Sequence, residues 1–160
     1  MAVTETFEPK EAWFSGEYHY ITDKCGGEQM NKKIASEFIQ LLKTTSVGQH
    51  ICISLSACSE KNVKVECGEQ THRRTGKDGK IPMTVSFRLK VPLSNENNAS
   101  FDINQTSNDI VTALVTADMT LTVSGVVIVS NMSRYPEIRL ASFACDEGQV
   151  LNAATCGKDT

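Results

Sequence analysis

The sequence lacks any long apolar run, and its charge is nearly balanced. Among the 160 residues, the longest apolar run is the short one near 123–129. A helix that spans a bilayer needs about 20 apolar residues, so we expect no membrane insertion. The net charge of -3 gives no field that would gather nucleic acid or anionic lipid, and neither is expected as a partner.

The sequence also lacks the short motifs that carry catalysis or bind a metal. It has no Gly-x-Ser-x-Gly elbow, and Gly26-Gly27 has no neighbouring lysine and hydroxyl to cradle a phosphate. No Cys-x-x-Cys pair occurs, and His19, His50 and His72 stand at no ligand spacing with the cysteines. We therefore predict no catalytic residue, no metal site and no cofactor, and we do not expect an enzyme.

What the chain does contain is six cysteines and three N-glycosylation sequons. The cysteines are Cys25, Cys52, Cys58, Cys67, Cys145 and Cys156. The sequons are Asn98-Ala99-Ser100, Asn104-Gln105-Thr106 and Asn131-Met132-Ser133. A single sequon arises easily by chance, but three of them beside an even set of cysteines indicate a disulfide-bonded glycoprotein. We expect it to be secreted or to lie on the extracellular face of the cell surface.

The first ten residues lack the charged-then-apolar order of a signal peptide. We interpret the chain as a piece of a larger extracellular protein. Composition divides it into a lead-in with a possible first strand at 1–22, a globular domain at 23–144 and the start of a cysteine-rich tail at 145–160.

Apolar periodicity predicts two helices. Met30, Ile34 and Phe38 recur at helical spacing, which indicates a helix over 28–43. A second helix is expected over 104–117.

Alternation predicts the strands. The clearest pattern covers 83–91, between Pro82 and Pro92, and a last strand is expected at 138–143. The segments 51–57 and 62–66 resemble the two arms of a hairpin. Around Ser124-Gly125, the apolar segments 119–123 and 126–129 form either one bulged strand or a tight hairpin.

This order of elements predicts an α+β fold with two helices on one face of an antiparallel sheet. It resembles the split β-α-β arrangement of ferredoxin-like and SEA domains, here stapled by disulfides.

Six cysteines allow 15 pairings. The expected 51–66 hairpin would bring Cys52 opposite Cys67 and leave Cys58 to reach Cys25. Cys145 and Cys156 would then close a local loop of their own.

The segment 68–80 is polar and basic, and we interpret it as a solvated connector. Its basic side chains are His72, Arg73, Arg74, Lys77 and Lys80. Two functional alternatives stay open for this binding loop: contact with a sulfated glycan, and presentation of Arg73 or Arg74 to a trypsin-like protease.

Ser124-Gly125-Val126-Val127 is similar, in scrambled order, to the glycine-serine-valine-valine turn of self-cleaving SEA modules. In those modules the serine follows the glycine, whereas here it precedes it. A bulge or a turn between apolar strands is therefore the stronger interpretation.

The spacing Cys145-x-x-Gly148-x-x-Leu151 with Cys156-Gly157 resembles the opening of the cysteine-rich repeat of ephrin receptors. Upstream, 52–67 and 85–89 resemble the segment before such repeats in extracellular mosaic proteins with sushi, EGF and CUB domains. The resemblance covers roughly 25–157 and rests on cysteine spacing, and only one cysteine pair of the repeat is present. It implies a cell adhesion module that binds other extracellular proteins.

The sequence thus favours a non-catalytic glycoprotein module that mediates protein-protein interaction in matrix or cell-surface adhesion. The alternatives are a secreted protease inhibitor that presents the 68–80 loop, and a SEA-like self-cleaving module.

Overall fold

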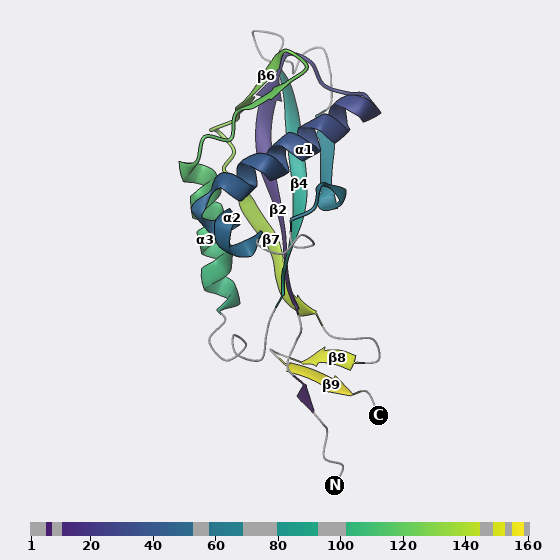
Figure 1. Cartoon of the computed structure of the whole chain (residues 1–160), viewed down its shortest axis with the longest axis vertical. Coiled ribbons are helices and arrows are strands. Elements are labelled where there is room, and N and C mark those ends of the chain that lie inside the picture. Colours follow the sequence, from purple (N-terminus) through teal and green to yellow (C-terminus); the bar gives the residue numbers. More distant parts are fainter. Residues whose placement is uncertain are drawn as a thin grey trace.

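The computed structural model of the chain describes residues 6–7, 11–52, 58–68, 80–92, 102–144, 149–152 and 155–158. These residues form a curled antiparallel sheet with three α-helices, two disulfide bonds and a smaller second sheet (Figure 1). The prediction of a disulfide-bonded α+β protein is confirmed at this level.

Two long strands form the centre of the main sheet. β2 (Glu11–Thr22) and β4 (Ile81–Pro92) are antiparallel and pair along their whole length. Their side chains alternate between buried and more accessible positions, because only one face of the sheet is covered. The strand expected at 83–91 is therefore confirmed. The sequence pattern placed residues 1–22 before the globular domain expected at 23–144. In the structure β2, which ends at Thr22, lies in the middle of the main sheet and is part of that domain.

The remaining strands extend the sheet on both sides of this pair. They are β3 (Val63–Cys67), β5 (Leu121–Val123), β6 (Val126–Ser130) and β7 (Glu137–Ala144). The strand order is β3-β4-β2-β6-β5, and β7 also pairs with β2. β6 meets β2 only at Tyr20 and Ile21, whereas β7 pairs with residues 11–17, so the two strands share one edge of β2.

Helix α1 (Glu28–Thr44) confirms the helix expected at 28–43. Ile34, Phe38 and Leu42 lie one turn apart and are buried together with Ala35 and Ile39. In Figure 1 the helix crosses in front of β2 and β4.

A second helix follows at once and extends to Ile51, the first residue of the strand that the sequence pattern predicted at 51–57. The Thr45 hydroxyl accepts a hydrogen bond from the Gly48 amide at 2.9 Å, which caps the N-terminus of α2 (Ser46–Ile51). A Cβ at Gly48 would lie 1.8 Å from the Leu42 carbonyl oxygen, so α2 folds tightly against the end of α1. His50, which directly precedes the segment expected as a strand, lies in this helix.

The predicted hairpin of 51–57 with 62–66 is wrong at its start, because Ile51 ends α2 and Cys52 is the C-cap of that helix. The chain passes through a short 3-10 turn, η1 (Glu60–Asn62), and β3 pairs with β4, with Val63 opposite Phe87 and Cys67 opposite Met83. Alternation identified β3 as a strand but could not identify its neighbour. Residues 53–57 lie outside the described part of the chain.

The disulfide pairing inferred from that hairpin is also wrong. The bonds join Cys25 to Cys67 and Cys52 to Cys58, with Cα atoms 5.9 Å and 5.2 Å apart. The first ties the chain just before α1 to the end of β3, and the second closes a local loop after α2.

Helix α3 (Ile103–Thr116) confirms the second expected helix. Asp102 caps it, because the carboxylate accepts hydrogen bonds from the Asn104 and Gln105 amides at 3.0 Å.

β5 and β6 form the tight hairpin that the sequence left as one of two alternatives. Its turn has positive φ at Ser124 (51°) and Gly125 (77°), the signs that a type I′ turn requires.

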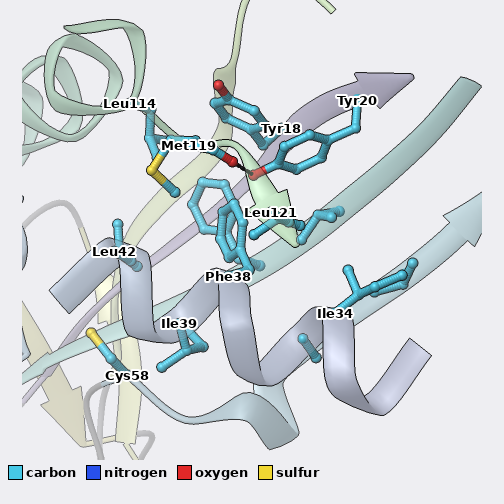
Figure 2. Packing of buried hydrophobic residues seen from close by; sticks show 14 of the residues in the cluster. Tyr18, Tyr20, Ile34, Phe38, Ile39, Leu42, Cys58, Leu114, Met119 and Leu121 are labelled. Carbon is cyan, nitrogen blue, oxygen red and sulfur yellow. Dashed lines mark hydrogen bonds between the residues drawn. The ribbon is translucent and has the colours of Figure 1, made fainter. Parts of the chain in front are cut away.

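Both long helices contribute to one core on the same face of the sheet. The Phe38 ring lies 5.6 Å from the Phe87 ring and 5.9 Å from the Tyr18 ring, measured between centroids. The Tyr20 hydroxyl donates a buried hydrogen bond of 2.7 Å to the Met119 carbonyl (Figure 2). From α3, Leu114 joins the same cluster.

The small sheet has the order β1-β9-β8 and brings the two ends of the chain together (Figure 1). Its strands are β1 (Thr6–Phe7), β8 (Gln149–Asn152) and β9 (Thr155–Lys158). Cys156 lies in β9, whereas Cys145 and its predicted bond lie outside the described residues.

Candidate functional site

The face of the sheet opposite the helices carries polar, charged and aromatic side chains. We call it the open face, because the helices in the described part of the chain pack on the other side. Its members are Trp13, Ser15, Glu17 and His19 of β2, Lys64 and Glu66 of β3, Thr84, Ser86, Arg88 and Lys90 of β4, and Glu137, Arg139, Leu140 and Ser142 of β7.

Strand register orders these side chains in rows that cross the sheet. One row runs Lys64, Ser86, Glu17, Glu137. The next contains Arg88, Ser15 and Leu140, and the third contains Lys90, Trp13 and Ser142. Neighbours in a row lie close enough to act on a ligand together.

A cation stacks on the aromatic ring in this array. The Arg88 guanidinium carbon lies 4.0 Å from the centroid of the Trp13 ring, and Lys90 Nζ lies 5.7 Å from it. Lys90 also pairs with Glu11 at 3.5 Å, whereas within the described residues no carboxylate pairs with Arg88. The ring orients the guanidinium and leaves its N–H donors available for an acidic ligand.

Arg139 holds two carboxylates that face each other across β2 and β7. Its Nε lies 3.0 Å from Glu17 Oε1 and 3.2 Å from Glu137 Oε1. Two like charges opposite each other would destabilise the pair, and the guanidinium between them offsets that repulsion.

A β-bulge directs Arg139 to this place. The register shifts between Ser15 and Gly16, so that Leu140 faces Ser15, Ile138 faces Gly16 and Arg139 is the additional residue. A Cβ at Gly16 would lie 2.6 Å from the Glu137 carbonyl oxygen, so the close approach of β7 requires glycine here.

His19 is the one strongly buried side chain of the open face, with 4% of it exposed. Its Nδ1 lies 3.2 Å from the Thr84 hydroxyl, and its Nε2 lies 3.7 Å from Glu17 Oε2. Burial, with the nearby Arg134 charge, lowers the pKa of His19, and so the ring is neutral at neutral pH.

Glu17, His19 and Glu137 bring potential ligand atoms within 4.8 Å of one another. The spacing of the histidines to the cysteines does not indicate this group, because its other two members are glutamates. Glu17 and His19 are two apart on a strand, the spacing that puts both on one face. In the structure the Arg139 guanidinium pairs with both carboxylates and supplies the positive charge that a metal ion would supply there.

A shallow depression of about 260 Å³ lies at the centre of the open face. Three cationic side chains, Lys64, Arg88 and Arg139, line it with Glu17 and Ser86. Such a surface suits a partner that presents carboxylates beside apolar groups.

A second cavity, also of about 260 Å³, lies beside the part of β2 where neither β6 nor β7 forms strand pairs with it. Tyr18 and His19 line it from β2, and the 131–136 connection spans it. The Tyr18 hydroxyl bonds Ser130 Oγ at 2.5 Å, and burial raises the Tyr18 pKa.

The structure places two of the three sequons. Asn104 is exposed on the first turn of α3, and Asn131 lies half-buried directly after β6. Asn98 lies outside the described residues.

Most of the predicted basic loop, including His72, Arg73, Arg74 and Lys77, also lies outside the described residues. Its last member, Lys80, pairs with Asp23 at 2.8 Å. The inhibitor and glycan hypotheses for this loop stay predictions.

The Ser124-Gly125 segment has an ordinary structural role. Its positive φ angles belong to the hairpin turn, and Lys33 of α1 donates to the exposed Ser124 hydroxyl at 3.2 Å. The turn conformation therefore needs no chemistry to explain it.

No helix among the described residues combines the length and apolar character needed to cross a bilayer. Comparison with protein-family models, with curated proteins and with solved structures finds no match to this chain.

Proposed function

We propose that this chain is a non-catalytic module of an extracellular glycoprotein that binds other extracellular proteins through the open face of its sheet. The role is adhesive, in the matrix or at a cell surface. The observation that carries the proposal is the stack of Arg88 on Trp13. The two residues lie on the paired strands β4 and β2, and Arg88 has no carboxylate partner among the described residues.

The open face has the composition of a recognition surface. Tryptophan and arginine dominate binding energy at protein interfaces, and Trp13 is the only tryptophan of the chain. Leu140 adds an exposed apolar side chain in the row next to Trp13. A partner segment with acidic side chains beside an apolar one fits this pattern.

The disulfides support the extracellular compartment. Disulfide bonds persist in oxidising compartments and are rare in the cytosol, and the four cysteines whose side chains the structure describes are all paired. The exposed sequon Asn104 and the half-buried Asn131 are compatible with sugar attachment at the surface.

We propose the split β-α-β arrangement as the finer description of the fold. Its support is the order β3-β4-β2-β7, with α1 between β2 and β3 in the chain and α3 between β4 and β7. The β5–β6 hairpin would then be an insertion. A crystal structure in which β7 does not lie beside β2 would contradict this description.

The test is binding of the protein, secreted from animal cells behind an added signal peptide, to cell-derived extracellular matrix. Arg88→Glu reverses the charge on the open face, and Lys32→Glu makes the same change on an exposed position of α1. We expect Arg88→Glu to weaken binding about tenfold, equivalent to about 1.4 kcal/mol, and Lys32→Glu to leave it unchanged. Equal binding by wild type and both variants, or retention of the chain as a reduced intracellular protein, would overturn the proposal.

A further inference from the structure

The cavity beside β2 has an accessible apolar rim. Met132 and Tyr135 of the 131–136 connection are 62% and 67% exposed, and Val115 of α3 lies partly exposed on the same cavity. Side chains this apolar and this exposed, gathered at one hollow, indicate a surface that another group covers.

Asn131 lies on the lining of the same cavity, in a well-defined geometry. Its amide N–H donates to the His19 carbonyl at 2.9 Å, which fixes the backbone. Its side-chain oxygen accepts hydrogen bonds from the Ser133 amide at 3.2 Å and the Ser133 hydroxyl at 2.6 Å. Both bonds use Oδ1, and Nδ2 makes no hydrogen bond to the described residues.

The Asn104 sequon differs in each of these respects. Asn104 is exposed on a helical turn, and the Thr106 hydroxyl donates to the Asp102 carbonyl at 3.0 Å instead of to the asparagine. A sugar there would extend into solvent from an exposed helical turn.

We propose that an N-linked sugar on Asn131 is a structural part of this protein, with its first N-acetylglucosamine covering the cavity and packing on Tyr135 and Met132. The inference rests on the extracellular role proposed above. In the modification, Nδ2 of Asn131 forms a bond to the anomeric carbon of a lipid-diphosphate-linked oligosaccharide. The bond from that carbon to the diphosphate oxygen breaks, the lipid diphosphate leaves with the electron pair, and Nδ2 loses one proton.

The fold accommodates this product without losing a contact. Substitution occurs at Nδ2, so the Oδ1 bonds to Ser133 persist. The apolar face of a sugar ring stacks on an aromatic ring such as Tyr135, and its hydroxyl groups meet polar lining groups such as Asp118 and Arg134.

The experiment compares the melting temperatures of two forms of the protein. One is secreted from animal cells and trimmed by an endoglycosidase, which leaves one N-acetylglucosamine on each occupied site. The other has the same sequence and is made without sugar in a bacterial periplasm. We expect the trimmed protein to melt about 2–4 °C higher. Trimmed Asn104→Gln should keep this difference, trimmed Asn131→Gln should lose it, and Tyr135→Ala should reduce it.

A protein that carries sugar on Asn131 but melts as the sugar-free form does would overturn the inference. So would a secreted, disulfide-bonded protein with Asn131 unoccupied. Neither result changes what is expected for matrix binding by wild type and Arg88→Glu. Failure of the proposed function would appear instead as equal matrix binding by wild type and Arg88→Glu.

Discussion

On β2 and β4 the inward and outward side chains alternate residue by residue, yet the two faces differ in almost every physical respect. Inward, Phe14, Tyr20 and Phe87 are almost wholly buried in one apolar cluster with α1 and α3. Outward, Trp13 and Arg88 stack where solvent reaches them. The same strands therefore stabilise the fold with one set of positions and hold a charged and aromatic surface toward solvent with the other.

The largest expected effect comes from the inner face. Phe38→Ala removes the ring that contacts Tyr18, Tyr20 and Phe87 at the centre of the core. We expect the free energy of unfolding to fall by about 3–5 kcal/mol, because the cavity adds to the loss of buried apolar area. Urea denaturation measures this, with Arg88→Ala as the outer-face control. A loss for Arg88→Ala as large as that for Phe38→Ala would contradict the division between the faces.

The two disulfides should differ in their contribution. Cys25–Cys67 spans 42 residues and Cys52–Cys58 spans 6, and a longer loop restricts the unfolded chain more. Loop entropy gives about 4 kcal/mol for the first bond and about 2 kcal/mol for the second. Paired Cys→Ala variants, each with the other bond intact, allow the comparison by urea denaturation. An equal or reversed order would show that native-state contacts outweigh loop entropy.

Gly16 affects both faces of the sheet. It points inward, and the β-bulge beside it places Arg139 of β7 on the open face. Gly16→Ala places a Cβ 2.6 Å from the Glu137 carbonyl oxygen and 2.7 Å from the Phe87 ring. We expect a loss of stability of about 1–3 kcal/mol together with weaker matrix binding. Ser15→Ala, next to it on the open face, is the control and should change stability by much less. A fully stable Gly16→Ala protein would show that β7 moves away freely.

The smallest effect concerns His19, the buried histidine of the outer face. The charged groups around it are Glu17, Arg134, Glu137 and Arg139, and burial is the main cause of its lowered pKa. The unfolded chain takes up the proton at higher pH than the folded chain does, so stability should fall as pH drops below about 6.5. Thermal melting between pH 7.5 and pH 5 in wild type and His19→Gln isolates this contribution. An identical pH dependence in the two proteins would contradict it.

Local periodicity in the sequence was enough to predict α1, α3 and β4. Each has a run of residues whose spacing alone defines a buried face, as in Ile34, Phe38 and Leu42. The strand predicted at 51–57 was wrong at Ile51, because the Thr45 side chain caps a new helix that extends to this residue. Such a cap is a local signal that the apolar pattern does not contain.

Pairing between distant segments could not be predicted in the same way. β3 pairs with β4, a neighbour that the sequence pattern did not indicate, and the disulfides join Cys25 to Cys67 and Cys52 to Cys58, not the pairs that the expected hairpin implied. The open face was missed for a similar reason. Arg88, Trp13 and Arg139 are far apart in sequence, and register together with the bulge at Gly16 brings them together.

The most direct test of the open face is hydroxyl-radical footprinting of the secreted protein, free and bound to cell-derived matrix. If a partner binds the open face, Trp13 and Leu140 are oxidised more slowly in the bound state, whereas Met30 of α1, on the other side of the sheet, is oxidised at an unchanged rate. Slower oxidation of Met30 with no protection of Trp13 would place the partner on the helices and contradict the account.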